Sequence, residues 1–265
     1  MTAPPAAEHW SGGQVTQRAH CVLAPNPGPM TLDGTNTWIL REPGGTRSIV
    51  IDPGPEDAGH LGRVGDEAGS VAVVLLTHGP VDHSEGARTF AERVHAPVRA
   101  LDPQHRWGDE GLGGGDVVAA DGLEVRVVAT PGHSADSLCF HLPADDAILT
   151  GDTVLGRGTT VVAHPDGRLV DYLDSLQRLR GMADAGLRTL LPGHGPVLAD
   201  AAGVLDFYLA HRQERLEQVR AALAAGATSP RDVVETVYAD VDRAVWPAAE
   251  LSVKAQIDYL RDHDG

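Results

Sequence analysis

Apolar runs rich in β-branched residues recur between residue 19 and about residue 198, and five of them end in clusters of His, Asp, Gly and Pro. Continuous apolar runs are typical of strands that are covered on both faces. Loops at strand ends are where binding and catalytic residues gather. The clusters occupy residues 51–54, 77–83, 130–133, 150–153 and 192–195. The sequence therefore predicts a sheet-based domain with a polar site at its strand ends.

Helical patterns lie between the predicted strands. The strands are predicted over residues 36–40, 48–51, 71–76, 98–101, 123–128, 137–140, 147–149 and 189–191. Helices are predicted over residues 84–94 and 170–182, where apolar residues in the second segment recur at helical spacing. Strands interleaved with surface helices indicate a layered α/β domain, with Trp38 in its core.

After about residue 200, Gly and Pro become scarce and helical periodicity dominates. A long helix carries Leu205, Leu216 and Val219 on one face, a second opens at Ser229 and Pro230, and a third begins near residue 247. Three helices with short links predict a small appended domain of winged-helix type. The expected organisation is an N-terminal arm over residues 1–19, an α/β domain over 20–200 and a helical domain over 201–265.

The charge of the chain argues against a nucleic-acid partner. The formal net charge is −16, and residues 201–265 contain 7 Lys or Arg against 11 Asp or Glu. An acidic helical tail does not suit a recognition helix on DNA. The tail is expected instead to pack over the mouth of the site or to form a contact in a homodimer.

Two cysteines in 265 residues, Cys21 and Cys139, favour a reducing compartment over a disulfide-stapled secreted fold. No segment approaches the roughly 18 uninterrupted apolar residues that a membrane span needs. The sequence predicts a cytoplasmic protein with no membrane contact and a small-molecule or acyl substrate.

Histidine and aspartate in separate turns, each after an apolar strand, suit a divalent cation that accepts imidazole nitrogen and carboxylate oxygen. Zinc is the expected ion, and manganese or iron would accept the same donors. Other histidines, among them His60, His105 and His211, have no partner spacing and are expected to be surface or packed residues.

These clusters resemble the metallo-β-lactamase fold hydrolases, whose signature is His-x-His-x-Asp-His followed by a later His, a bridging Asp and a final His. Residues 32–38, 151–160, 191–196 and the segment beginning at 210 are similar to the lactamase-β-2-like branch of that superfamily. The resemblance spans nearly the whole chain. It implies an αββα sandwich with one or two metal ions at one edge of two facing sheets.

Carried over by position, the resemblance assigns ligands to two metals, which would acidify a water for attack on an electrophilic centre. His78 and His133 would hold the first metal, Asp82, His83 and His194 the second, and Asp152 would bridge them. Asp82 and Asp52 are the candidate catalytic residues, with Asp52 expected to orient ligands without touching the metal.

The chain departs from the signature at Pro80, where the family has its second His. Proline has no side-chain donor, so the first metal keeps only His78, His133 and a share of Asp152. The set around Asp82 is therefore expected to be the tighter one. A replacement ligand from His164 or His141 is the alternative.

The resemblance also indicates residues for the substrate cleft, namely Asn36, Gly158, Thr159 and Thr160. The predicted function is metal-dependent hydrolysis of an ester, thioester or similar activated carbonyl compound. One alternative is a phosphodiesterase of the single-strand-specific endoribonuclease type. The other is a catalytically impaired homologue that keeps a metal- or ligand-binding role because of Pro80.

Overall fold

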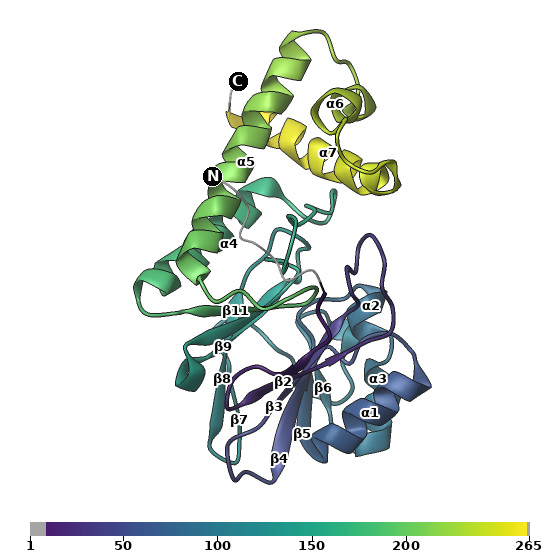
Figure 1. Cartoon of the computed structure of the whole chain (residues 1–265), viewed down its shortest axis with the longest axis vertical. Coiled ribbons are helices and arrows are strands. Elements are labelled where there is room, and N and C mark those ends of the chain that lie inside the picture. Colours follow the sequence, from purple (N-terminus) through teal and green to yellow (C-terminus); the bar gives the residue numbers. More distant parts are fainter. Residues whose placement is uncertain (1–8, 264–265) are drawn as a thin grey trace.

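The structure is a computed structural model that describes residues 9–263, in which two β-sheets pack face to face with helices on their outer sides (Figure 1). The first sheet contains, in both sequence and spatial order, β1 (Gly13–Gln14), β2 (Ala19–Leu23), β3 (Asn36–Leu40), β4 (Arg47–Ile51), β5 (Ser70–Leu75) and β6 (Val98–Arg99). The second contains β7 (Val117–Ala120), β8 (Leu123–Ala129), β9 (Leu138–Leu142), β10 (Ala147–Gly151) and β11 (Thr189–Pro192), again as consecutive neighbours.

The helices are α1 (Ala58–Ala68), α2 (Val81–Ser84), α3 (Ala87–Val94), α4 (Leu169–Asp184), α5 (Ala201–Ala224), α6 (Pro230–Val237) and α7 (Trp246–His263). Short 3-10 turns lie at Pro103–His105, Pro143–Asp145 and Arg243–Val245. No helix among residues 9–263 has both the length and the apolar character needed to cross a bilayer.

Strands such as β3, β4 and β10 are buried on both faces because they lie between two apolar layers, whereas β7 and β8 alternate buried and exposed residues. In β4, Ile49 and Ile51 point into the core between the sheets, whereas Val50 packs under α1 and α3. In β5, Val73 and Val74 alternate in the same way. This alternation explains the continuous apolar runs of the sequence and confirms the αββα architecture. Trp38 lies in the layer between the sheets, as predicted.

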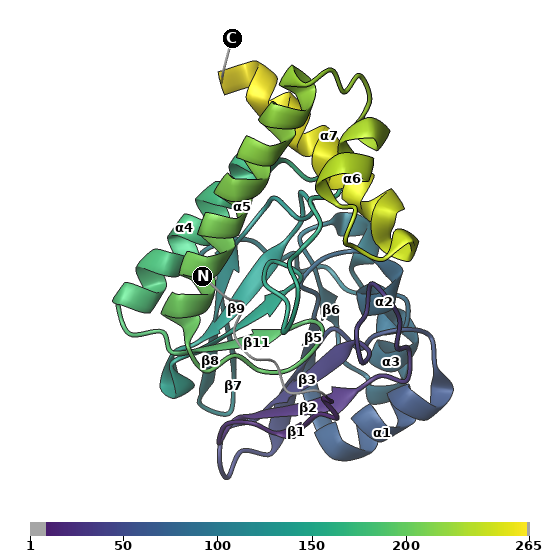
Figure 2. The same cartoon turned by 45° about the horizontal axis from the view of Figure 1, so that its top comes forward.

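The C-terminal helices share a core with the sandwich. A single apolar cluster joins Cys139 and Ile148 of the second sheet to Leu205 of α5 and to Val253 and Leu260 of α7. Figure 2 shows α6 and α7 lying beyond one end of the strands, while α5 begins beside the second sheet and α4 and runs up to them. The α6 helix begins at the predicted Ser229 cap, which forms a capping box with Asp232.

The predicted helix over residues 84–94 corresponds to α3, which begins at Ala87, and residues 81–84 before it form a separate short helix, α2. The two helices are separated at Gly86, where the backbone packs against the loop after β4. The Gly86 amide donates to Gly54 O at 2.9 Å. A Cβ at Gly86 would lie 2.8 Å from Pro55 O. The sequence pattern also did not predict β1, β2, β7 or α1.

Part of the predicted N-terminal arm, residues 1–8, lies outside the described residues. The rest of it is tied to the sandwich by β1 and by Trp10, whose indole Nε1 donates to Asn36 Oδ1 at 2.7 Å. Residues 9–19 are therefore held by a strand pairing and a part-buried hydrogen bond.

Candidate metal centre

The five polar clusters meet at one edge of the sandwich. Asp52 follows β4, His78 follows β5, His133 follows β8, Asp152 follows β10 and His194 follows β11. The α2 helix, which begins right after the His78 turn, adds Asp82 and His83. Neighbouring strands end at the same edge of the sandwich. Side chains from segments more than a hundred residues apart in the chain therefore lie close together there.

The first group of possible ligands is His78, His133 and Asp152, with their ligand atoms within 4.8 Å of one another. Asp152 Oδ2 lies 4.0 Å from His78 Nε2 and 3.9 Å from His133 Nε2. These separations are too long for hydrogen bonds and leave room for an ion at the distances zinc takes from nitrogen and oxygen.

The second group is Asp82, His83 and His194, again within 4.8 Å of one another. Asp82 Oδ2 lies 3.1 Å from His194 Nε2 and 3.5 Å from His83 Nε2. The other oxygen of Asp152, Oδ1, lies 3.5 Å from both of these imidazole nitrogens. Asp152 thus presents one carboxylate oxygen to each group, which is the arrangement of a bridging ligand.

Asp52 orients the loop that carries both groups. Its backbone takes a left-handed φ of 50° at the end of β4, a conformation that aspartate tolerates better than most residues. Its carboxylate then accepts from Thr77 N at 2.8 Å and from Thr77 Oγ1 at 2.6 Å. It also pairs with His83 Nδ1 at 2.9 Å. Asp52 does not belong to either ligand group and is a positioning residue.

The remaining imidazoles are also fixed through Nδ1, which leaves Nε2 for the site. His133 Nδ1 donates to Val161 O at 2.7 Å and His194 Nδ1 donates to Gly34 O at 3.1 Å. A ring that donates its Nδ1 proton to a carbonyl carries its lone pair on Nε2. Both rings therefore direct Nε2 at the site, and their neutral form would present the lone pair there that a metal ion requires.

Charges in the site oppose the cost of burial. Burial and the neighbouring His83 push the pKa of His78 well below its usual value, so this ring is neutral. Burial would raise the pKa of Asp152, but His194 and His83 outweigh it and hold that pKa well below its usual value. Burial would also raise the pKa of Asp82, but its hydrogen bond with His194 outweighs this effect and lowers that pKa. Burial would lower the pKa of His83 and of His194, but the charge of Asp152 outweighs it and raises both, so these two rings carry protons that a bound metal ion would replace. Charged carboxylates, the neutral His78 ring and two imidazoles that release a proton form a donor set that binds zinc.

Two buried ligand atoms of the site, His78 Nε2 and Asp152 Oδ1, have no hydrogen-bond partner among the described residues. Unpartnered buried polar atoms are costly, and a coordinated cation would satisfy both. Gly193 leaves the space: a Cβ there would lie 2.8 Å from Asp152 Oδ1 and 2.8 Å from His83 Cε1. The residues present fit a divalent metal ion.

Pro80 caps the N-terminus of α2 with its backbone carbonyl, which accepts from His83 N and Ser84 N at 3.0 Å each. Its ring offers no ligand, so the first group has three donors and the second group has three plus Asp152. The suggested replacements lie elsewhere. His164 Nε2 pairs with Asp258 at 3.0 Å, and His141 lies within β9, opposite Ile148.

Comparison with protein families identifies the superfamily of the chain. The model of the metallo-beta-lactamase superfamily matches residues 30–194, and that of the beta-lactamase associated winged helix domain matches residues 229–262. The chain belongs to the metallo-beta-lactamase superfamily. Members of this superfamily bind divalent metals and act as hydrolases, so the chain is a metal-dependent hydrolase with a C-terminal winged-helix domain.

Individual relatives agree with this membership. The beta-lactamase-like protein 2 homolog of Caenorhabditis elegans is 32% identical over 255 residues, 90% of this chain and 82% of that protein. The atrochrysone carboxyl ACP thioesterase of Aspergillus fumigatus is 33% identical over 237 residues, 82% of this chain and 72% of that protein. A metallo-beta-lactamase family protein from Thermus thermophilus shares the fold, with a TM-score of 0.79, 22% identity and coverage of 93% of this chain and 94% of that one.

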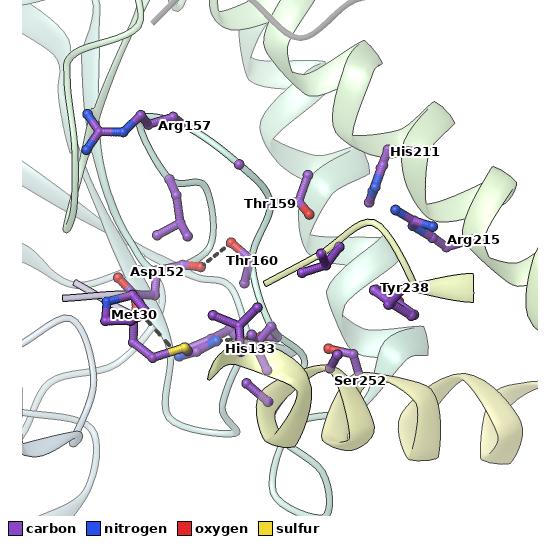
Figure 3. A pocket seen from close by; sticks show the side chains of 18 of the residues that line it. Met30, His133, Asp152, Arg157, Thr159, Thr160, His211, Arg215, Tyr238 and Ser252 are labelled. Atoms are coloured by element: carbon purple, nitrogen blue, oxygen red, sulfur yellow. Dashed lines mark hydrogen bonds and ion pairs between the residues drawn. The ribbon is translucent and has the colours of Figure 1, made fainter. Parts of the chain in front are cut away.

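A pocket in this metallo-beta-lactamase superfamily member opens beside His133 and Asp152 and has a volume of about 320 Å³ (Figure 3). Gly158, Thr159 and Thr160, the residues that the resemblance indicated for the substrate cleft, are in its lining. Thr160 also donates from Oγ1 to Asp152 O at 2.7 Å, which ties the pocket wall to the metal centre.

The expectation for Asn36 is not met. Asn36 is fully buried and does not line the pocket. Its side-chain amide donates to Pro192 O and Gly195 O at 2.9 Å each, so its donors are used to hold the loop that carries His194. Sequence similarity alone does not distinguish a side chain that binds substrate from one that braces a loop.

From the sequence, the helical tail was expected over the mouth of the site or at a homodimer contact, but none of its residues was named as part of this pocket. His211, Arg212 and Arg215 of α5 line it, together with Tyr238 and Val245. His211 was expected to be a surface or packed residue. The available signal was the spacing of residues 211 and 215, which places a histidine and an arginine on one helix face.

Proposed function

We propose that this chain hydrolyses an acyl ester or thioester with a metal-activated water, and that zinc is its metal. The observation that carries the proposal is the pocket: it begins at His133 and Asp152 and is lined largely by apolar side chains, among them Leu32, Leu155 and Val161. An apolar pocket that ends at a hydrolytic centre suits a substrate with a reactive carbonyl on a hydrocarbon group.

When bound, divalent cations supply Lewis acidity and lower the pKa of a water molecule. Between the two ligand-group carboxylates, Asp82 is the more accessible, with a side chain that is 26% exposed against 14% for Asp152. Burial would raise its pKa, but the hydrogen bond with His194 and the charge of His83 lower it, so Asp82 is ionised and can accept a hydrogen bond from the attacking water and orient it. Asp52 keeps His83 in position throughout and transfers no proton to substrate.

Water is the proposed nucleophile because the cysteines are unsuited to the task. Cys21 and Cys139 are both buried. Burial raises the pKa of Cys139 to about 11, and it raises the pKa of Cys21 further. A thiol with so high a pKa supplies little thiolate at neutral pH.

The choice of substrate class draws on two further observations. The fungal relative at 33% identity is named as a thioesterase of an acyl carrier protein. The net charge of −16 disfavours long-range attraction of a polynucleotide, which argues against an RNA substrate.

The test is a panel of a thioester, a lactone, a β-lactam and a short single-stranded RNA, each assayed with added zinc or manganese. Thioester or ester hydrolysis that is abolished by a chelator and by Asp82→Asn supports the proposal. Cleavage of the RNA alone would contradict it. No turnover of any substrate, with metal bound, would favour the impaired homologue that Pro80 suggests.

A further inference from the structure

One wall of the pocket is cationic, although most of the lining is apolar. His211 and Arg215 reach it from α5, across the pocket from His133 and Asp152 (Figure 3), and Arg212 of the same helix lines it as well. Arg212 is 2% exposed. Three buried nitrogens of this wall, Nε of Arg212, Nε of Arg215 and Nδ1 of His211, have no hydrogen-bond partner within residues 9–263.

Neither guanidinium group is paired with a carboxylate in the described part of the chain. There, no carboxylate oxygen lies within 4.0 Å of a nitrogen of Arg212 or Arg215. Arg157, which lines the same pocket, is different: its Nη1 lies 2.6 Å from Asp33 Oδ2. Burial, followed by the charges of Arg212 and Arg215, lowers the pKa of His211 to about 4, which reflects a positive field at this wall.

Neither arginine is free to swing out to solvent. Arg215 stacks on the Tyr238 ring at 4.6 Å and donates from Nη1 to Val237 O at 2.9 Å. Arg212 lies 4.9 Å over the Tyr172 ring and donates to Thr160 O. Planar guanidinium groups held in this way present their remaining N–H donors in a fixed direction, which suits recognition of a carboxylate or phosphate.

A fixed cation without a carboxylate partner is unfavourable in a buried position such as that of Arg212, and less so in the half-buried position of Arg215, unless an anion completes it. Both arginines face a cavity, so the anion can be part of a ligand. The remaining lining, which includes Met30, Val241 and Val245, suits a hydrocarbon segment between the metal centre and this wall.

Building on the proposed acyl hydrolysis, we propose that the pocket selects substrates that carry an anionic oxygen group on an apolar segment. The reacting carbonyl lies at the metal centre, and the carboxylate or phosphate binds Arg215 and Arg212 beside His211. The C-terminal domain is thereby a specificity element of the site, since α5 supplies His211, Arg212 and Arg215.

The first test measures binding, so it does not depend on turnover. Butanoate, hexanoate and octanoate are compared with butanedioate, hexanedioate and octanedioate by calorimetry on the full-length, metal-loaded protein. One carboxylate is common to both series, and only the diacids add a second. At the matching chain length the diacid is expected to bind about 10- to 100-fold more tightly, the usual range for hydrogen bonds to charged groups.

Arg215→Leu is expected to remove most of that preference while leaving monoacid binding within about twofold. Arg215→Lys keeps the charge and should retain part of the preference, which separates a loss of recognition from a loss of packing. Arg231→Leu is the matched control, because Arg231 also lies over an aromatic ring, Trp246 at 4.7 Å, but is paired with Glu250 and lies outside the pocket. Equal binding of both series at every length, or a preference unchanged in Arg215→Leu, overturns the proposal.

A second readout follows His211 by NMR, with its resonance assigned from a His211→Gln variant. A bound anion offsets the field of Arg212 and Arg215, so the His211 pKa should rise from about 4 when the diacid binds and stay unchanged with the monoacid. If the diacid binds in this way but no ester or thioester is hydrolysed, the anion site stands and the proposed acyl hydrolysis fails.

Two thioesters distinguish whether the bound anion is a carboxylate on the acyl side of the substrate or a phosphate on its thiol side. Octanedioyl N-acetylcysteamine carries a carboxylate on its acyl side and no phosphate, whereas octanoyl phosphopantetheine carries a phosphate on its thiol side. Octanoyl N-acetylcysteamine, which has neither group, is the reference. A gain in kcat/KM for one of the charged substrates that Arg215→Leu abolishes identifies the source. No gain for either charged substrate contradicts the proposal.

Discussion

Asp52 and His83 form a buried pair in which the carboxylate lies 2.9 Å from imidazole Nδ1, and the opposite edge of the same ring directs Nε2 at the second ligand group. Asp52 also accepts from the backbone and hydroxyl of Thr77, next to His78. One side chain thus aligns histidines of both ligand groups, and the geometry of the centre depends on a residue that does not reach the ion.

Asp52→Asn is therefore expected to weaken metal binding without removing a ligand. The amide keeps one acceptor but loses the charge that fixes the His83 tautomer, and changes of this kind cost about 10- to 100-fold in metal affinity. Competition with a chromophoric chelator measures the change. Asp66→Asn, an exposed carboxylate on α1, is the control and should leave affinity unaltered. Unchanged affinity in Asp52→Asn would show that Thr77 and packing alone hold His83.

Pro80 leads to a prediction about stoichiometry. The wild-type protein is expected to bind one zinc ion tightly at Asp82, His83 and His194 and a second one weakly, because the first group has lost a donor. Pro80→His should raise the affinity of the weak site by at least about tenfold, since a whole ligand is gained. Pro80 is exposed and contributes only its carbonyl to α2, so the replacement fits without disturbing that helix.

Zinc titration of the two proteins tests this directly, with Pro80→Ala as the control for loss of the proline ring. Two equivalents held equally tightly by the wild-type protein would contradict the prediction. Tight binding of a single equivalent at His78 and His133 would reverse the assignment of the stronger site.

The sequence predicted those features that leave a short local pattern in the chain, namely strands and clusters of possible metal ligands. Apolar runs located most strands because they are short local patterns. The His and Asp clusters indicated a metal site, and the family resemblance that they carry assigned their residues to the two groups that the structure brings together. The residues of the pocket were harder to predict from the sequence. Asn36 and Thr160 lie in similar polar segments, yet Asn36 holds a loop in place whereas Thr160 lines the cavity. That difference, like the position of Arg215, depends on packing between residues far apart in the chain.

Tyr208 of α5 connects the C-terminal domain to the loop over residues 155–158, which lines the pocket. Its buried hydroxyl accepts from Leu155 N at 2.9 Å and lies 3.3 Å from Gly158 O. Tyr208→Phe leaves the Leu155 amide without its partner, which should cost about 1 to 2 kcal/mol of unfolding free energy. Because Leu155 and Gly158 line the pocket, KM should rise more than kcat falls.

Denaturant unfolding and steady-state kinetics measure the two effects of Tyr208→Phe. Tyr259→Phe on α7 is the control, since that ring stacks on His263 at 4.0 Å and its hydroxyl lies outside the pocket lining. An unchanged KM with a lowered stability would limit Tyr208 to a structural role.

His60 provides a pH dependence of stability that is separate from the metal ligands. It is fully buried in α1, and its Nε2 donates to Thr37 Oγ1 at 2.9 Å, since that hydroxyl itself donates to Asp52 O. Burial, with a smaller effect of Arg63, lowers the His60 pKa from 6.5 to about 4. Between these values the unfolded chain binds a proton that the folded chain does not.

Acidification therefore favours the unfolded state, and stability should fall as pH drops from 6.5 towards 4. This group contributes up to about 3 kcal/mol over that window, from about 1.4 kcal/mol per unit of pKa difference. His60→Gln keeps a donor for Thr37 and removes the titration, so its unfolding free energy should depend less on pH between 6.5 and 4. Parallel pH profiles for the two proteins, measured by urea unfolding, would show that His60 does not carry the effect.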